Sequence, residues 1–194
     1  IRDFTYSPDA EWVFVGGNDC NNATILYRFP VADPLAIERL SPIGPDECFG
    51  LFDHWPSISP DGARLTFENL RWNGRDYSVR VMTIATAEVT EIVVGGQAPR
   101  WSPIADQIAY WNDNRIWVVK SDGTGPRAIS PVGHKYVPGV NWSTDGQWIL
   151  ARFLPRDGWA GTTVVVLKVN TGEEIPLAWS TGYRSYGLPA WKPE

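Results

Sequence analysis

Residues 58–62 read Ile58-Ser59-Pro60-Asp61-Gly62: an apolar residue, a small polar residue and a turn. The same order recurs along the 194-residue chain, with an aromatic residue often in the first position. The other copies are Tyr6-Ser7-Pro8-Asp9, Trp101-Ser102-Pro103, Trp142-Ser143-Thr144-Asp145-Gly146 and Trp191-Lys192-Pro193. Their second positions are separated by 52, 43, 41 and 49 residues, so the chain consists of one degenerate repeat with insertions.

The residue types in this segment predict a reversal of the chain. Proline sets φ near about −65° at the first central position of a turn, aspartate accepts hydrogen bonds from nearby backbone, and glycine accepts a left-handed conformation. We therefore interpret each aspartate of the repeat as a turn former and assign none of them to catalysis.

Two apolar-rich strands are expected after each turn, followed by a tight turn and a third strand, and a fourth carries the chain into the next repeat. The first strands are expected at 12–15, 64–67, 107–111 and 147–153, and the second at 24–29, 77–84, 115–120 and 162–169. Four short antiparallel strands in each repeat are typical of propeller blades. The sequence thus predicts an all-β fold, a β-propeller of about four blades. Its 11 Trp, 18 Gly and 16 Pro favour short strands and tight turns over long helices.

The third repeat also resembles a known family. Trp101-Ser102-Pro103, the strand Gln107–Tyr110 and the segment Ile116–Gly123 are similar to the TolB-type (WD-like) β-propeller repeat. The resemblance covers nearly the whole chain and is most specific from Pro99 to Ser130, whereas Asp9-Ala10 departs from the pattern. It implies the fold rather than a function, because propellers host unrelated activities.

The repeat places the blades at about residues 1–53, 54–98, 99–136 and 137–185, with a closing or next inner strand at 186–194. Proteins that resemble this family often finish on such a strand, which closes the ring against the first blade. We therefore expect a part of a larger propeller, with blades before Ile1. A free-standing ring of four blades is the alternative.

The charge pattern and the length of the apolar runs exclude two kinds of partner, nucleic acid and the interior of a membrane. The formal net charge is −5 without a basic block, so no electrostatic footprint for nucleic acid is present. The longest apolar runs, such as Thr163–Leu167, are far shorter than the ~20 residues of a spanning helix, so this segment is not expected to insert directly into a membrane.

Catalytic, metal and cofactor motifs are missing from the sequence. It has no Gly-x-Ser-x-Gly elbow, His-Glu-x-x-His, P-loop or Cys-x-x-Cys, and Gly123–Ala128 is expected to be a hairpin turn. The two histidines, His54 and His134, are expected in loops or at the surface. The polar positions expected on inner strands offer no convergent carboxylates for a metal; they are Thr5, Ser57, Arg100 and Asn141, with Ala190 in the last copy. We predict a protein that is not an enzyme and uses no cofactor.

The loops of a blade divide between two faces because its strands alternate in direction. One face receives the short Ser-Pro-Asp-Gly turns, and the other receives nearly every insertion. Variable loops on a rigid scaffold usually carry function, and Trp, Tyr and Arg are common at interface hot spots. The predicted partner-binding residues on the loop-rich face are Arg71, Trp72, Arg75, Arg156, Trp159, Tyr183 and Arg184.

Cys20 and Cys48 fall on this same face. A bridge between them would close a loop of about 28 residues and contribute roughly 3 kcal/mol in the chain-entropy model. We predict this disulfide, and with it an extracytoplasmic location (periplasmic, cell-surface or secreted). Asn22 begins a glycosylation pattern that only a glycosylating host would use.

These features favour an extracytoplasmic propeller that binds a protein partner or builds a larger assembly. The alternative is the non-catalytic propeller domain of a larger hydrolase such as a peptidase. A third option, a propeller lyase or hydrolase with a metal in its channel, ranks last.

Overall fold

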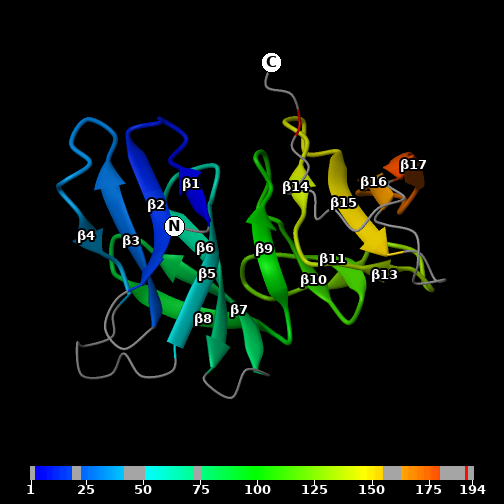
Figure 1. Ribbon diagram of the computed structural model, residues 1–194, viewed down its shortest axis with the longest axis horizontal. Helices are drawn as coiled ribbons and strands as arrows, with labels where there is room; N and C mark the ends of the chain where they lie inside the picture. The colour runs from blue at the N-terminus through cyan, green and yellow to red at the C-terminus, as the bar shows by residue number, and fades with distance from the viewer. Residues whose placement is uncertain are drawn as a thin grey trace. The chain divides into compact units, whose positions relative to one another are not determined.

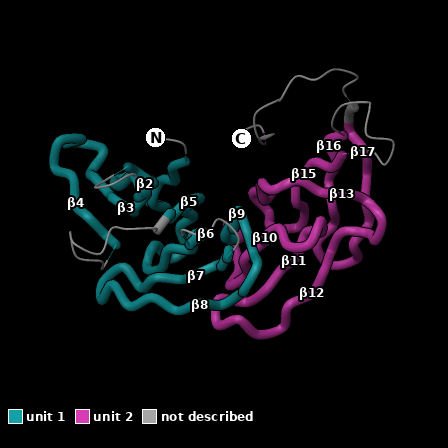
Figure 2. Tube along the Cα trace, turned by 60° about the horizontal axis from the view of Figure 1, so that its bottom comes forward, with its two compact units in different colours: residues 1–101 teal, residues 102–194 magenta. Residues whose placement is uncertain are grey.

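The computed structural model describes residues 3–18, 23–41, 51–71, 76–154, 163–179 and 191. These residues form strands joined by turns, without a helix, which confirms the all-β prediction (Figure 1). The chain divides into two compact units, residues 1–101 and 102–194 (Figure 2).

Unit 1 contains two consecutive sets of four antiparallel strands and a final ninth strand. The first set is β1 (Phe4–Tyr6), β2 (Trp12–Asn18), β3 (Thr24–Pro30) and β4 (Glu38–Arg39). The second set is β5 (Leu51–Ile58), β6 (Arg64–Arg71), β7 (Tyr77–Thr83) and β8 (Glu88–Val94). The sequence predicted separate sheets, but a single parallel pair, Thr24 with Phe52, joins the two sets. The last strand, β9 (Gln97–Trp101), lies against β5 and β6.

Unit 2 continues the same pattern. Its first strands, β10 (Ile108–Asn112), β11 (Arg115–Val119) and β12 (Arg127–Ala128), pair in order, so the segment around Gly123 is the expected hairpin. They are followed by β13 (Lys135–Tyr136), β14 (Asn141–Trp142), β15 (Trp148–Leu154), β16 (Thr163–Lys168) and β17 (Glu174–Trp179). Both β13 and β14 pair with β15, so the inner strand of this blade is interrupted at 137–140, where Gly139 has a φ of 110°.

Each unit has its own core of alternating strand residues. In unit 1 the cluster is Phe14, Leu26, Leu65, Phe67 and Met82, each at most 2% exposed. In unit 2 it is built from β10, β11, β15 and β16 around residues such as Ile116, Ile149 and Leu167. The expected strand positions are confirmed. The blade boundaries themselves stay a prediction.

Two strands are longer than their apolar patterns indicated. β6 continues beyond Phe67 through Glu68 and Asn69, and β2 continues through Gly16 and Gly17. Glu68 and Asn69 are buried and hydrogen-bonded, so polar residues occupy strand positions beyond the apolar run at 64–67.

The repeated turn is built by one serine and one aspartate. Ser59 Oγ accepts the N–H of Arg64 at 2.9 Å and donates to Asp61 Oδ1 at 2.5 Å, and Asp61 Oδ1 accepts the N–H of Ala63 at 3.0 Å. The copies at Ser7 and Ser143 make the same bonds. These donors lower the pKa of Asp61 and of its counterparts Asp9 and Asp145. The aspartates are therefore turn formers, as predicted.

The residue after each aspartate is left-handed. Gly62 and Gly146 have φ values of 72° and 65°, and Ala10 stands at the same place in the first copy with a φ of 59°. A Cβ atom costs about 1–2 kcal/mol in this conformation. A Cβ at Gly146 would also lie 2.5 Å from Cγ1 of Ile104.

Gly146→Ala is therefore expected to lower the free energy of unfolding by about 1–2 kcal/mol. Ala10→Gly is expected to raise it by about 0.5 kcal/mol, because relief of the left-handed alanine exceeds the added flexibility of the unfolded chain. Urea unfolding of both variants measures these changes. A loss of stability in Ala10→Gly would contradict the interpretation of the turn.

Candidate functional site

Most of the predicted binding residues lie outside the described part of the chain. These are Trp72, Arg75, Arg156, Trp159, Tyr183 and Arg184, and both predicted disulfide partners, Cys20 and Cys48, lie outside it as well. Their roles stay predictions. Arg71 is described, as the exposed last residue of β6.

The strand register shows that the loops of unit 1 divide as predicted. Asn18 pairs with Thr24, Thr24 with Phe52, Phe52 with Leu70, and Leu70 with Tyr77. These residues end or begin strands, so the strand ends that flank residues 19–22, 42–50 and 72–75 all lie at one end of the strands, the loop-rich edge of the sheet. The Ser-Pro-Asp-Gly turns leave it at the opposite edge.

A cavity of about 220 Å³ opens at this loop-rich edge. It brings the guanidinium-bearing Arg71 together with two acidic residues, Asp76 and Glu91, beside Tyr77 and Val94, whose side chain is 77% exposed. The backbone N–H of Arg71 donates to the carbonyl of Asp76 at 3.2 Å, which fixes the end of β6. The cavity is lined by Arg71, Asp76, Tyr77, Ser78, Glu91, Val94 and Gly95. Groups of both charges around a partly apolar opening suit a polar segment of another protein.

Unit 1 contains two buried carboxylates at positions that the sequence analysis did not single out. Asp53 on β5 accepts hydrogen bonds from Asn69 Nδ2 at 2.7 Å and from Ser41 Oγ at 3.1 Å, and burial raises its pKa to about 6. Glu68 on β6 accepts the N–H of Ala98 at 2.8 Å, and burial raises its pKa to about 7. Sequence reasoning missed both because Asp53 lies beyond the short repeat segment and Glu68 follows the apolar run that marked its strand.

The neighbouring polar groups in unit 1 hold the inner strands together. Arg100 donates to the carbonyl of Trp55 at 3.4 Å and lies over its ring at 4.9 Å, and Trp55 is a left-handed residue at a register shift in β5. Ser57 Oγ accepts the N–H of Trp101 at 2.9 Å. These bonds join β5 to β9, so the polar inner positions have structural partners.

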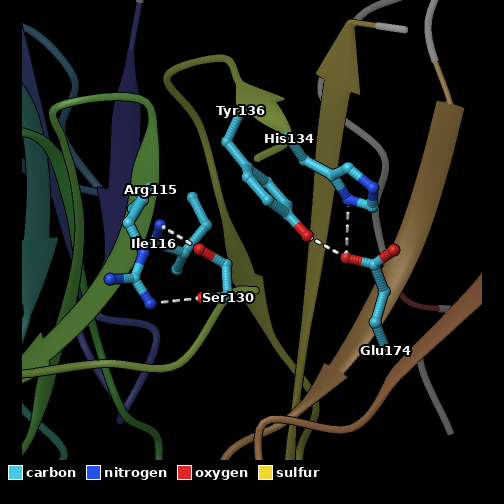
Figure 3. Close-up of polar contacts among 6 residues, drawn as sticks. All are labelled: Arg115, Ile116, Ser130, His134, Tyr136 and Glu174. Carbon is cyan, nitrogen blue, oxygen red and sulfur yellow. Dashed lines mark hydrogen bonds and ion pairs between the residues drawn. The ribbon is translucent and has the colours of Figure 1, made fainter. Parts of the chain in front are cut away.

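Unit 2 contains a second polar cluster, around Glu174 (Figure 3). The carboxylate of Glu174 accepts the hydroxyl hydrogen of buried Tyr136, and its Oε2 lies 3.3 Å from Nδ1 of His134. The ring of His134 stacks on Phe153 with centroids 4.3 Å apart. Burial, with the adjacent Glu174, raises the pKa of Tyr136.

This cluster ties the segment before β13 to β17, because the carboxylate of Glu174 on β17 contacts both His134 and Tyr136. The same segment is fixed at its start by Ser130, whose Oγ accepts the N–H of Ile116 at 2.9 Å and whose carbonyl accepts from Arg115 at 2.6 Å (Figure 3). Because His134 and Glu174 are 40 residues apart, no local motif could have indicated this contact.

Within the described ranges, no group of three or more His, Cys, Asp or Glu residues is placed to hold a metal ion. The same ranges contain no helix that is long and apolar enough to span a bilayer. The fold and this edge of loops define the class of protein as a partial β-propeller.

Among solved structures, this chain is similar in fold to TolB proteins. The chain is similar to a protein assigned as TolB in Agrobacterium tumefaciens, with a TM-score of 0.76, 18% identity, and coverage of 93% of this chain and 66% of that one. It is also similar to TolB from Acinetobacter baumannii, with a TM-score of 0.74, 19% identity, and coverage of 91% and 43%. A puromycin-hydrolyzing peptidase from Mycobacterium tuberculosis gives a TM-score of 0.66 at 18% identity, with coverage of 90% and 30%. The fold is thus that of TolB-type propellers, which confirms the resemblance seen in the repeat.

Neither a protein-family model nor a curated protein sequence matches the chain. The chain spans about two thirds of the first TolB structure and less than half of the second. At these identities the likeness concerns the fold, and the activity has to be argued from the site.

Proposed function

We propose that this propeller is a non-enzymatic module that binds a protein partner through its loop-rich face. The observation that carries the proposal is the cavity at Arg71, which opens at the loop-rich edge of unit 1 among the ends of β6 and β8 and the start of β7. The antiparallel sheet supplies a rigid base, and the cavity presents a guanidinium, two acidic residues and an exposed apolar side chain. Such a mixed surface favours another protein over a small apolar ligand.

The remaining predicted residues lie outside the described ranges and enter the proposal through the repeat alone. Trp72 and Arg75 belong to the connection that begins after Arg71, and the connections of the last repeat contain Arg156, Trp159, Tyr183 and Arg184. An extracytoplasmic location is part of the proposal and rests on the predicted Cys20–Cys48 bridge, because disulfides persist in oxidising compartments.

The second candidate is the propeller domain of a larger hydrolase. The similarity to the puromycin-hydrolyzing peptidase, of which this chain covers 30%, favours it. The full-length gene discriminates between the two. An adjoining α/β segment with a nucleophile elbow supports the hydrolase, and its absence supports the binding module.

Arg71→Ala is expected to weaken partner binding about tenfold without changing the unfolding midpoint, because an exposed arginine at a binding surface contributes more to association than to folding. The test purifies the full-length protein with its partner, identifies that partner by mass spectrometry, and compares dissociation constants by calorimetry. Arg75→Ala and Trp159→Ala are expected to act in the same direction.

Glu88→Ala is the matched control, because Glu88 is an exposed charged residue at the opposite end of the same blade. Its dissociation constant should equal that of the unsubstituted protein. If Glu88→Ala weakened binding and Arg71→Ala did not, the partner would bind elsewhere and the proposal would be wrong.

A further inference from the structure

The opposite edge of unit 1 carries a second and larger cavity, of about 380 Å³. The turns 7–11, 59–63 and 84–87 surround it, so it lies among the Ser-Pro-Asp-Gly turns of the first two repeats. The sequence indicated no function for this face. Its floor is aromatic and aliphatic, from Trp12, Phe14 and Ile84, and its walls carry Asp9, Asp61 and Arg28.

The floor is fixed by the core. Phe14 is 2% exposed and belongs to the hydrophobic cluster of unit 1, and Trp12 and Ile84 pack against that cluster while remaining partly exposed. A ligand at this place would contact apolar side chains that are already ordered, which reduces the entropy lost on binding.

The charge of the cavity is negative. Asp9 and Asp61 are held in their turns by serine and backbone donors that lower the pKa of each, so both are ionised at neutral pH. The guanidinium of Arg28 lies over the ring of Trp12 at 4.4 Å and bonds to Glu38, with Nη2 2.6 Å from Oε2, so its charge is already compensated. Arg64 Nη2 lies 4.0 Å from Asp61 Oδ2 and offsets part of the charge of Asp61. Asp9 is held only by serine and backbone donors, so the walls keep a net negative charge that attracts a cation.

An exposed apolar loop lies beside the same turns. The β3–β4 connection, residues 31–37, was expected to be short, yet Val31, Leu35 and Ile37 in it are 46%, 89% and 60% exposed. The N–H of Val31 donates to the carbonyl of Glu11 at 2.8 Å, which joins this loop to the first turn. Exposed apolar residues gathered next to a cavity are characteristic of interaction sites.

We propose that this edge of unit 1 binds an extended segment of a partner protein in which a lysine or arginine is flanked by apolar residues. The basic group lies between Asp9 and Asp61, and its aliphatic stem covers Trp12 and Ile84. The apolar neighbours contact Leu35 and Ile37. This site is separate from the cavity at Arg71 and does not depend on it.

The test titrates the ¹⁵N-labelled full-length protein with two probe peptides, acetyl-Leu-Ala-Arg-Leu-amide and acetyl-Leu-Ala-Glu-Leu-amide, to millimolar concentration. The arginine peptide is expected to shift the backbone resonances of Asp9, Gly62 and Leu35, and the glutamate peptide to leave them unchanged. Added salt should weaken the binding of the arginine peptide, because salt screens exposed charge pairs. Equal shifts from the two peptides, shifts at other residues, or no shifts at all would overturn the proposal.

Two variants sharpen the test. Asp9→Asn with Asp61→Asn keeps an Oδ1 acceptor for each turn and removes both charges, so the spectrum should retain its dispersion while affinity for the arginine peptide falls about fivefold. Leu35→Ser should lower affinity for the arginine peptide, because it removes an apolar contact and leaves both charges in place. Val132→Ser is the control, since Val132 is an 81% exposed apolar residue in unit 2. If Val132→Ser weakened binding as much as Leu35→Ser, the apolar contacts would lie elsewhere.

Discussion

Truncating Trp101 to alanine is expected to lower the free energy of unfolding by about 3–5 kcal/mol. The side chain is 5% exposed at the end of β9, and the guanidinium of Arg64 lies over its ring at 4.9 Å. Its backbone N–H is bound to Ser57 Oγ on β5. The truncation removes a large apolar ring and leaves a cavity between strands that cannot close over it, because both are fixed by hydrogen bonds.

Urea unfolding followed by circular dichroism measures this loss, and Trp101→Phe is its control. Among the described residues the buried Nε1 of Trp101 has no hydrogen-bond partner. Phenylalanine therefore removes volume without breaking a bond and should lower the free energy of unfolding by less than half as much as alanine. Near-equal losses in the two variants would show that the indole group makes a specific contact rather than filling space.

Trp142 is less deeply buried than Trp101. It packs against the core of unit 2 but keeps part of its surface exposed, since β14 has only two residues and the inner strand is interrupted just before it. Trp142→Ala should therefore lower the free energy of unfolding by less than Trp101→Ala does, by about 1–2 kcal/mol. The repeat specifies where each tryptophan occurs, whereas its burial depends on neighbours that the repeat does not contain.

The features that the sequence predicted well are local. In the Ser59 turn every hydrogen bond closes within five residues, so the residue types alone determine the reversal and the start of the next strand. The division of loops between two edges follows from strand alternation, and the register from Asn18 to Tyr77 confirms it for unit 1.

The features that the sequence missed depend on contacts between distant segments. Asp53 is buried because Ser41 and Asn69, 12 and 16 residues away, supply donors for it, and Glu174 is held by residues some 40 positions earlier. The apolar loop 31–37 was missed for another reason. Its Asp33-Pro34 pair matches an ordinary turn, and only the structure shows that its apolar side chains remain exposed.

Glu68→Gln is expected to stabilise the protein at pH 8 by about 3 kcal/mol and to leave its stability at pH 4 nearly unchanged. Burial raises the pKa of Glu68 from 4.5 to about 7 in the folded protein. Between these values the unfolded chain loses the proton and the folded protein keeps it, so stability falls as pH rises through this window. Above pH 7 both states are ionised and the loss is complete. Glutamine can still accept the N–H of Ala98 and cannot ionise.

The measurement is urea unfolding of both proteins from pH 4 to 8, with Glu11→Gln as an exposed control. The pKa of Asp53 is raised to about 6, so Asp53 also lowers stability as pH rises. The free energy of unfolding of Glu68→Gln therefore still falls somewhat with pH. The turn aspartates act in the opposite direction, because their lowered pKa values confer stability that is lost only as pH falls below about 4. They therefore do not obscure the window between pH 4.5 and 7. Curves for Glu68→Gln and the unsubstituted protein that ran parallel across this window would show that Glu68 ionises at its ordinary pKa, and its burial would then have to be compensated by a cation.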